Sequence, residues 1–256
     1  MIDTHSHLLP GVDHGCPDLE TSILMARAAA DSGVDVVVCT PHLPEWDEAL
    51  IRRTGIVLRE VKEGLVAAGV ELELRSGFEV DLSVALTVDT TRLCALTIEG
   101  SGGAILFETP YSGWPLFIEE VIFRLSAEGF TPVLAHPERN ERVQRSPDLL
   151  ARCLKAGAVA QATAGSIGGM FGKGAERTFF RLISEGLISI LASDAHSFRK
   201  EDWTMDPMLE ALKGRVSEED LLTLTETNPR RLLAGKKLLP VRPENGKSRQ
   251  RRWILP

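Results

Sequence analysis

The sequence predicts an α/β fold whose parallel strands close into a distorted barrel. Short apolar runs rich in β-branched residues alternate with longer segments of helical periodicity along most of the chain. Strand and helix repeated in this order predict a parallel sheet, and the number of repeats favours a closed barrel. The length of 256 residues fits one such domain, because α/β barrels routinely reach this size.

The predicted strands are short runs of buried character. Residues 34–39 form the clearest one, because four of the six are valine. Residues 5–7 are expected to lie at the end of a strand at the N-terminus. Five further runs have the same apolar character and are expected to be strands: 71–76, 104–107, 131–135, 159–162 and 188–192.

Segments with helical spacing separate these strands. The predicted helices cover residues 18–31, 45–68, 117–128, 147–155 and 175–185, and two short ones follow at 205–212 and 217–224. Several end at a glycine, which readily takes the left-handed backbone conformation that terminates many helices. These glycines are Gly33, Gly69, Gly129, Gly157 and Gly186.

A glycine-rich segment interrupts the pattern between residues 97 and 107. Gly100, Gly102 and Gly103 indicate a local hairpin here, which would distort a regular barrel. No linker rich in Pro, Gly or Ser and no internal repeat divides the chain. We therefore expect a single domain over residues 1–240, followed by a basic C-terminal tail over residues 241–256.

Charge is unevenly distributed along the chain. The net charge is −7, but the segment from Lys236 onward carries seven basic residues and one acid, so residues 1–235 carry −13. An acidic body argues against a nucleic-acid-binding module, which needs a basic face. The tail is expected to be a solvated chain end, with contact to an acidic partner or anionic lipid as the alternative.

Composition also indicates a compartment. No basic stretch followed by an apolar one opens the chain, and no apolar run approaches the ~20 residues of a membrane helix. The four cysteines are scattered without short paired spacing, as expected for reduced thiols. These features predict a soluble cytoplasmic protein.

The six histidines follow one positional rule. All but His14, which falls in the first loop, lie at or just beyond the end of a predicted strand, and three acids do the same. The carboxyl ends of parallel strands meet on one face, where sites are built. Divalent cations accept neutral imidazole and neutralise clustered carboxylates. The predicted metal ligands are His5, His7, His14, His42, Glu79, Glu108, His136, Asp194 and His196.

Each of these residues also has a structural interpretation. A lone histidine such as His136 is more often a core or capping residue, and Glu79 and Glu108 could form salt bridges at the barrel mouth. Asp194 could cap the following helix. Their common placement at strand ends is what favours a metal site.

The ordered motifs resemble the polymerase-and-histidinol-phosphatase (PHP) superfamily. Within it they resemble most the bacterial metal-dependent protein-tyrosine phosphatases of capsule and exopolysaccharide loci, the CpsB/YwqE type. The resemblance covers residues 1–235, and its motifs are highly specific as a set. These motifs are IDTHSHLLPGVD from residue 2, TPH at 40–42, GFE at 77–79, ETP at 108–110, AHPER at 135–139, QATAGS at 161–166, ASDAH at 192–196 and NPRRLL at 228–233.

The resemblance implies a distorted (β/α)7 barrel of the PHP type that holds three divalent metals, Mn in the first instance, with Fe, Co or Zn as alternatives. His5, His7, Glu79 and Asp194 would hold the first metal. Glu79, Glu108 and His136 would hold the second, and His14, His42 and His196 the third.

Two positions depart from the family pattern. The capsule-type enzymes usually have Asp where this chain has His14, so the site is one negative charge poorer and its metal preference open. After His42, residues 43–46 lack the Gly- and Tyr-bearing loop that is often found there, which leaves substrate preference in doubt.

The implied activity is metal-dependent hydrolysis of phosphate monoesters. Two metals about 3.5–4 Å apart would hold a hydroxide that attacks phosphorus in line. Arg139, Glu108 and His136 are the candidate catalytic residues. Arg139 would contact the phosphoryl oxygens or else form a structural salt bridge with a neighbouring acid such as Glu138 or Glu141, and Arg199 is a weaker candidate for a second phosphate contact.

Other activities find less support in the sequence. No cysteine has an arginine at the spacing of a cysteine-phosphatase loop, and there is no Gly-x4-Gly-Lys loop. A metal-dependent amidohydrolase would need a lysine at a strand end, and none of the predicted strands offers one. A regulatory protein without turnover would tolerate a vacant ligand position, whereas every predicted position is filled here. The implied partner is the phosphotyrosyl tail of a bacterial tyrosine autokinase, and histidinol phosphate or another small monoester is the alternative. Oligomeric state stays open.

Overall fold

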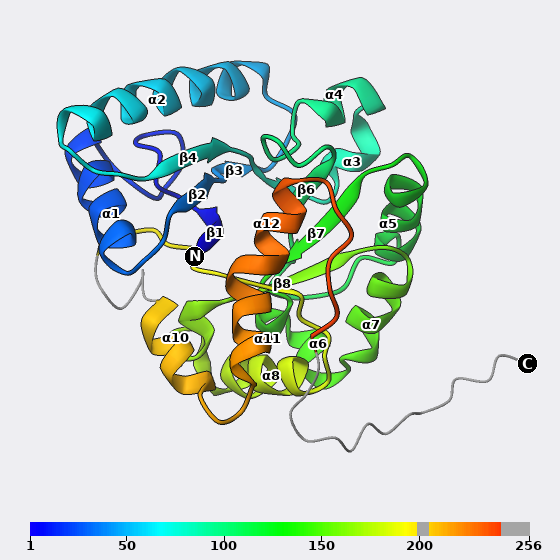
Figure 1. Ribbon diagram of the computed structural model, residues 1–256. Coiled ribbons are helices and arrows are strands. Elements are labelled where there is room, and N and C mark those ends of the chain that lie inside the picture. Colours follow the sequence, from blue (N-terminus) through cyan, green and yellow to red (C-terminus); the bar gives the residue numbers. More distant parts are fainter. Residues whose placement is uncertain (199–204, 242–256) are drawn as a thin grey trace, which may run out of the picture.

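The computed structural model describes residues 1–198 and 205–241 as a parallel α/β arrangement in which helices surround the strands (Figure 1). All strand pairs are parallel within this part of the chain. The strands are β1 (Ile2–Ser6), β2 (Val36–Cys39), β3 (His42–Leu43), β4 (Glu73–Ser76), β5 (Glu79–Asp81), β6 (Ala104–Glu108), β7 (Thr131–Ala135), β8 (Val159–Thr163) and β9 (Ile190–Ala192).

Two of the strand positions are broken in the middle. Two residues separate β2 from β3, and two separate β4 from β5, so the strands fall into sheets of order β1-β2-β4 and β3-β5-β6-β7-β8-β9. Backbone hydrogen bonds continue across the breaks: Gly77 N–H donates to Cys39 at 3.0 Å, and Glu79 N–H donates to Pro41 at 3.1 Å. Each broken pair therefore occupies one strand position, which gives seven positions.

The first and last strands meet at a seam. Ser6 pairs in parallel with Ala195, three residues beyond the end of β9. His7 N–H donates to the carbonyl of Ala195, and Asp194 N–H donates to that of His5, both at 2.9 Å. This contact brings the seven strand positions into a distorted barrel, which confirms the predicted fold class.

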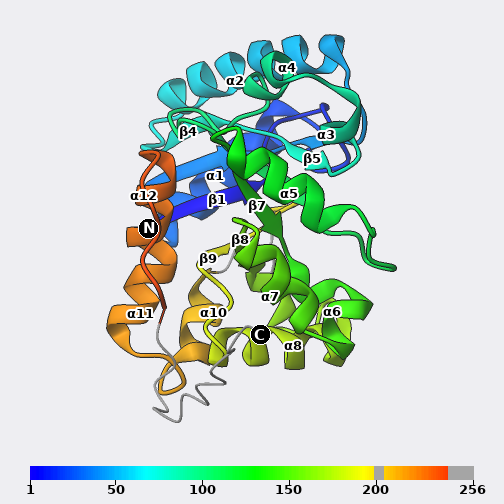
Figure 2. The same ribbon diagram turned by 90° about the vertical axis from the view of Figure 1, so that its right-hand side faces the viewer.

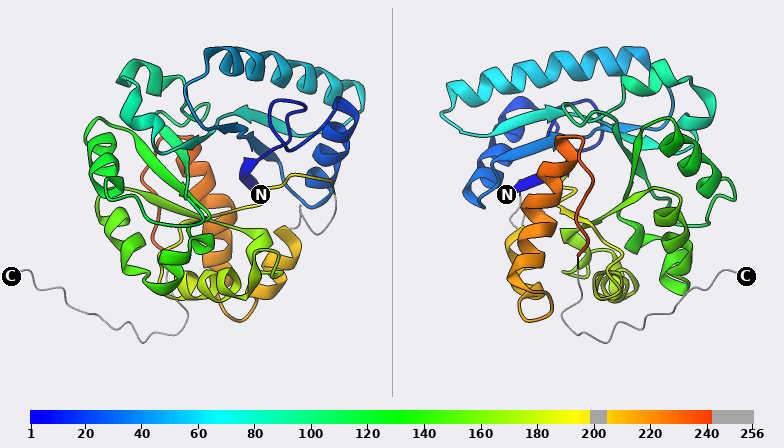
Figure 3. Two further views of the ribbon diagram at one scale, coloured as in Figure 1. Left: turned by 180° about the vertical axis from the view of Figure 1, so that it is seen from behind. Right: turned by 45° about the vertical axis from the view of Figure 1, so that its right-hand side comes forward.

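The helices lie outside the strands (Figures 2 and 3). Single 3-10 turns cover Pro137–Arg139 and Ala164–Ser166, and a π-helical turn covers Thr223–Thr227. The α-helices are α1 (Leu19–Asp31), α2 (Glu48–Ala67), α3 (Val84–Thr87), α4 (Thr90–Cys94), α5 (Ile118–Ala127), α6 (Glu141–Arg145), α7 (Asp148–Lys155), α8 (Gly172–Ser184), α10 (Met205–Leu212), α11 (Glu218–Leu222) and α12 (Asn228–Leu233).

Local sequence explains where several helices begin and end. Asp18 and Asp47 accept hydrogen bonds from the first free N–H groups of α1 and α2, as aspartate does at helix starts. The five glycines predicted to terminate helices all have a positive φ, between 64° and 115°, so this prediction is confirmed. None of the helices among the described residues is long and apolar enough to cross a membrane.

The barrel interior is filled at the amino ends of the strands. Ile2, Val36, Leu106 and Ile190 belong to one buried apolar cluster, which Leu232 of α12 also joins. Figure 1 shows α12 passing across this end of the strands. Alternate residues of a strand face the same side, so the row that contains Leu106 ends at Glu108, on the opposite end of the barrel.

The predicted hairpin between residues 97 and 107 is wrong. One hydrogen bond joins Ile98 N–H to the carbonyl of Ala104 at 2.8 Å, but residues 97–103 form no strand, and β6 pairs in parallel with β5 and β7. The glycine loop turns instead toward α12: the α-carbon of Gly235 lies 3.9 Å from the position that a β-carbon on Gly102 would occupy. Residues 242–256 of the predicted basic tail lie outside the described residues.

Candidate metal centre

A pocket of about 390 Å³ opens at the carboxyl ends of the strands. Seven of the nine predicted ligands reach it or the group of side chains at its base, directly from strand ends, as the sequence predicts; His14 reaches it from the loop after β1, and His196 from the loop after β9. The residues that line the pocket are His14, His42, Pro44, Glu79, Glu108, Tyr111, His136, Asp194 and His196.

Four ligand atoms converge at the buried base of this site. His5 Nε2 lies 3.3 Å from His7 Nε2 and 3.2 Å from Glu79 Oε2. Asp194 Oδ1 lies 3.2 Å from each imidazole nitrogen. A metal about 2.0–2.1 Å from four tetrahedral ligands would separate the ligand atoms by about 3.3–3.4 Å. The spacing of this quartet therefore fits a single divalent cation.

An unsatisfied polar atom supports the same interpretation. Asp194 Oδ1 is buried and has no donor in hydrogen-bonding geometry among the described residues, although the two imidazole nitrogens lie 3.2 Å away; Oδ2 lies 2.7 Å from Nη1 of Arg139. Buried polar atoms are nearly always satisfied, and a carboxylate oxygen without a donor calls for a physical explanation even though other buried atoms here also lack a partner. A cation in contact with Oδ1 provides one.

Glu79 links the quartet to the rest of the cluster. Its Oε1 lies 2.8 Å from His136 Nε2, and its Oε2 lies 3.2 Å from His42 Nδ1. His42 Nδ1 also lies 3.8 Å from Glu108 Oε2, so His42, Glu79 and Glu108 form a second group of ligand atoms within 4.8 Å. The predicted second set had His136 with these two acids; the structure places His136 on the other oxygen of Glu79.

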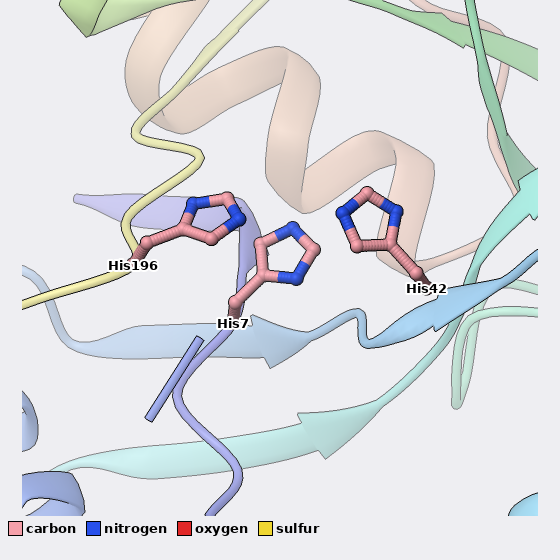
Figure 4. Close-up of side chains that lie close together, drawn as sticks. All are labelled: His7, His42 and His196. Atoms are coloured by element: carbon pink, nitrogen blue, oxygen red, sulfur yellow. The ribbon is translucent and has the colours of Figure 1, made fainter. Parts of the chain in front are cut away.

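A third group consists of imidazoles. Figure 4 shows His7 just beyond β1, His42 on β3 and His196 on the loop after β9, with their rings close together. The ring of His14 stacks on those of His42 and His196 at centroid distances of 4.9 and 4.8 Å. The predicted third set had His14 with His42 and His196; the structure brings His7 into the group of ligand atoms instead, and the exposed His14 stacks beside it, so ligation by His14 stays a prediction.

Two outer partners orient the ligands of the quartet, and no role was predicted for either. Asp13 Oδ2 lies 2.6 Å from Nδ1 of His7, and the side-chain amide of Gln161 lies 3.0 Å from Nδ1 of His5. Asp13 can accept a proton from Nδ1 and so leave Nε2 of His7 available to a metal, whereas the donating amide of Gln161 constrains the orientation of the His5 ring. Asp13 stands six residues from His7 in an irregular loop, so neither helical nor strand periodicity in the sequence predicts the contact.

Two ligands have a left-handed backbone conformation. His136 has φ 38° and Asp194 has φ 57°, and within the described residues they are the sole non-glycine residues with positive φ. Such conformations cost of order 1 kcal/mol or more and cluster at functional sites. Here they turn each side chain inward immediately after β7 and β9.

Charges within the quartet are strongly coupled. Burial opposes a charge on His7, but the facing carboxylates of Asp13, Asp194 and Glu79 outweigh burial and hold its pKa well above the ordinary value. Burial also opposes ionisation of Glu79 and Asp194, yet the imidazole of His5 outweighs it and holds both pKa values well below normal. The carboxylates are thus balanced by positive charge at the position where a metal would lie.

Arg139 is turned away from the pocket. Its Nη1 pairs with Asp194, its Nη2 donates to Thr163 Oγ1 at 2.6 Å, and its guanidinium carbon lies 3.5 Å from the ring centroid of Phe171. The partner is therefore a metal-ligand candidate rather than Glu138 or Glu141. A contact of Arg139 with phosphate stays a prediction, and Arg199 lies outside the described residues.

A barrel that gathers histidines and carboxylates at the carboxyl ends of its strands defines the class of α/β-barrel metalloenzymes. Within this class the chain belongs to the capsular polysaccharide synthesis family CpsB/CapC, whose family model matches residues 1–234. The family membership predicted from the motifs is thereby confirmed.

Individual relatives agree with this membership. The chain is 31% identical over 254 residues to the tyrosine-protein phosphatase YwqE of Bacillus subtilis (strain 168), which covers 98% of each chain. It is 29% identical over 224 residues to the CapC protein of Staphylococcus aureus, covering 86% of this chain and 87% of that protein.

Solved structures give the same result. A chain from the crystal structures of YwqE from Bacillus subtilis and CpsB from Streptococcus pneumoniae, described as unique metal-dependent tyrosine phosphatases, matches with a TM-score of 0.81 at 30% identity, covering 95% of this chain and 99% of that one. Dihydropyrimidinase from Brevibacillus agri matches with a TM-score of 0.54 at 13% identity, which shows likeness of fold alone.

Proposed function

We propose that this protein is a metal-dependent protein-tyrosine phosphatase. The observation that carries the proposal is the quartet of His5, His7, Glu79 and Asp194, whose ligand atoms are spaced for a divalent cation at the base of an open pocket. The relatives that cover nearly the whole chain are tyrosine-protein phosphatases, which favours this activity over other metal-assisted hydrolyses.

The proposed centre holds three divalent metals, Mn²⁺ in the first instance and Fe, Co or Zn as alternatives. The quartet would hold one. Glu79 and Glu108, together with His136 or His42, would hold the second. His14, His42 and His196 would hold the third. When bound, such metals supply Lewis acidity, which activates a water and withdraws charge from a phosphoryl group.

The protein's own side chains supply orientation and charge balance. Glu79 belongs to the quartet and also contacts His136, so it links two groups of ligands and constrains their relative positions. Glu108 lies on the pocket wall, where burial and the charge of Glu79 raise its pKa. Arg139 holds one oxygen of Asp194 and so leaves the other free for a cation.

The proposed substrate is the phosphotyrosyl tail of a bacterial tyrosine autokinase that controls polysaccharide export, and the proposed compartment is the cytoplasm. Family membership in capsular polysaccharide synthesis supports this choice. A small phosphate monoester such as histidinol phosphate would use the same ligands, so the two substrates must be compared directly.

Phosphate release from a substrate panel tests the proposal. The Mn²⁺-loaded protein is offered a phosphotyrosyl peptide, a phosphoseryl peptide, histidinol phosphate and a phosphodiester. We expect the phosphotyrosyl peptide to have the highest kcat/KM, and Asp194→Ala and chelated protein to lose at least 100-fold. Preference for histidinol phosphate would reassign the substrate, preference for the diester would place the protein among nucleases, and no release would refute phosphatase activity.

A further inference from the structure

One aromatic side chain lies at the mouth of the pocket. Tyr111 is the only tyrosine in the sequence, and it lines the pocket together with Glu79, Glu108 and His136. It follows the end of β6 by three residues, and it is 54% exposed. A large ring left half in solvent beside a polar pocket is available for contact with a ligand.

The backbone around Tyr111 is fixed. The carbonyl of Tyr111 accepts a hydrogen bond from Glu141 N–H at 3.0 Å. On either side, the amide of Asn140 donates to the carbonyls of Pro110 and Gly113, at 2.5 and 2.8 Å. Three hydrogen bonds thus tie this loop to the start of α6, so the ring extends from a constrained loop.

The orientation of the ring is defined relative to the metal cluster. The ring of Tyr111 is nearly parallel to that of His136, with an interplanar angle of 9° and a centroid distance of 6.1 Å. This distance lies in the range of offset aromatic pairs, and Tyr111 both lines the pocket and is exposed to solvent. The ring therefore forms an apolar wall next to a polar base.

We propose that Tyr111 is a specificity-determining residue that stacks against the aryl group of the substrate and makes the site prefer aryl over alkyl phosphates. This inference rests on the proposed phosphatase function. A phosphotyrosyl ring whose phosphate faces the ligand groups extends outward by the length of one ring, toward the side chains that line the mouth. Among those side chains Tyr111 is the aromatic residue that is not a histidine, and so not a candidate metal ligand.

A structural role for Tyr111 gives a different outcome. If the ring acted only by supporting His136, its loss would weaken every phosphate ligand to the same extent. If it contacts the aryl group, its loss weakens aryl ligands alone. Non-hydrolysable phosphonates separate the two, because their binding does not depend on leaving-group chemistry.

The experiment compares the binding of benzylphosphonate and methylphosphonate to the Mn²⁺-loaded protein by calorimetry. We expect the wild type to prefer benzylphosphonate and Tyr111→Phe to keep the preference. Tyr111→Ala should reduce it by about three- to tenfold, the range for one aromatic pair, with methylphosphonate binding unchanged within about twofold. Phe123→Ala, which removes a 66% exposed ring outside the pocket lining, is the matched control and should change neither ligand.

Two results would overturn the inference: a Tyr111→Ala variant that keeps the aryl preference, or one that loses affinity for both phosphonates equally. Release of phosphate from p-nitrophenyl phosphate by the same samples tests the proposed function separately. Activity without a Tyr111-dependent preference refutes the inference alone, whereas absence of both activity and phosphonate binding refutes the proposed function and the inference with it.

Discussion

The carboxylate of Asp13 lies 2.6 Å from Nδ1 of His7, on the opposite side of the ring from the nitrogen that faces the quartet. The same carboxylate accepts hydrogen bonds from the backbone N–H groups of Gly15 and His42, at 2.9 and 3.2 Å. One side chain therefore connects three segments that each carry or adjoin a candidate ligand. Asp13 is the outer support of the site.

Replacing Asp13 should weaken metal binding without unfolding the protein. Asp13→Asn removes the charge that orients His7 and raises its basicity, and losses of this kind typically cost 10–100-fold in metal affinity. Titration of Mn²⁺ against a competing chelator measures the change. Asp47→Asn, at an exposed helix start, is the matched control and should leave the affinity for Mn²⁺ unchanged. An equal loss of affinity in both variants would contradict the role of Asp13.

Metal binding to the quartet should weaken as pH falls. Burial opposes the charge on His7, but Asp13, Asp194 and Glu79 raise its pKa well above 6.5, so a metal must displace a proton below that pKa. Burial lowers the pKa of His42 to about 4, so this ligand stays neutral in mild acid. Chelator competition from pH 8 to pH 6 should show one metal lost first; loss of all metals together would contradict this order.

In the metal-free protein, His7 and Asp13 together determine how the stability of the fold depends on pH. His7 has a raised folded pKa, so it stabilises the fold fully below pH 6.5 and this stability disappears as pH rises through the folded pKa. Burial raises the pKa of Asp13, but its hydrogen bond with His7 outweighs burial and holds the pKa at about 2, so its stabilisation disappears as pH falls from 3.8 toward 2. Urea unfolding with chelator should therefore show the largest wild-type advantage over Asp13→Asn between about pH 4 and pH 6.5.

Gly15 cannot accept a side chain without displacing a ligand segment. A β-carbon there would lie 2.5 Å from the carbonyl oxygen of His7 and 2.6 Å from its Cβ. Gly15→Ala should reduce metal content and activity at least tenfold. Gly55→Ala, on the open face of α2, meets nothing within 4 Å and should instead stabilise the fold by about 0.5–1 kcal/mol. Equal effects of the two substitutions on metal content would refute the steric argument.

Arg139 offers a test that separates two roles. Because its guanidinium is buried against Asp194 and Thr163, we expect Arg139→Ala to weaken metal binding about tenfold or more. At saturating Mn²⁺ the inhibition constant of inorganic phosphate should stay within about threefold of wild type. A large rise in that constant with metal content intact would instead assign Arg139 to the phosphoryl group.

Glu79 should be the most damaging single ligand to replace. Its two oxygens contact His5, His42 and His136, so Glu79→Gln leaves two ligand groups incomplete. We expect elemental analysis to show fewer metals per chain and activity reduced by at least 100-fold. Glu119→Gln, at an exposed salt bridge on α5, controls for loss of charge; unchanged metal content in Glu79→Gln would remove Glu79 from the proposed ligand set.

The strand and helix order could be predicted because each element carries its own local signal. Runs such as 131–135 are apolar and β-branched, and glycine marks the helix ends. The breaks within two strand positions could not be predicted, because each consists of only two residues, 40–41 and 77–78. The strand segments that follow, β3 and β5, are too short to show an alternating pattern of their own. The glycine-rich loop near residue 102 suggested a hairpin because glycine marks turns of every kind.

Most of the candidate ligands could be found because they stand at or just beyond a strand end, and the fold brings those ends together; His14 and His196 lie in the loops that follow β1 and β9. Their grouping could not be found in the same way, since side-chain orientation within the site depends on contacts between distant residues. The left-handed backbone at His136 redirects its ring toward Glu79, and no residue pattern announces such a conformation. Asp13 and Gln161 act through loops and neighbouring strands, where sequence spacing carries little spatial information.

The seam between the first and last strands has a consequence for biogenesis. His5 and His7 emerge early from the ribosome, whereas Asp194 is added nearly 190 residues later, and the quartet requires all of them. With the proposed ligand set, a growing chain would present only part of the quartet, and the full set would form only when the segment after β9 pairs with the end of β1. Loading of the proposed metal would then follow synthesis of the whole barrel.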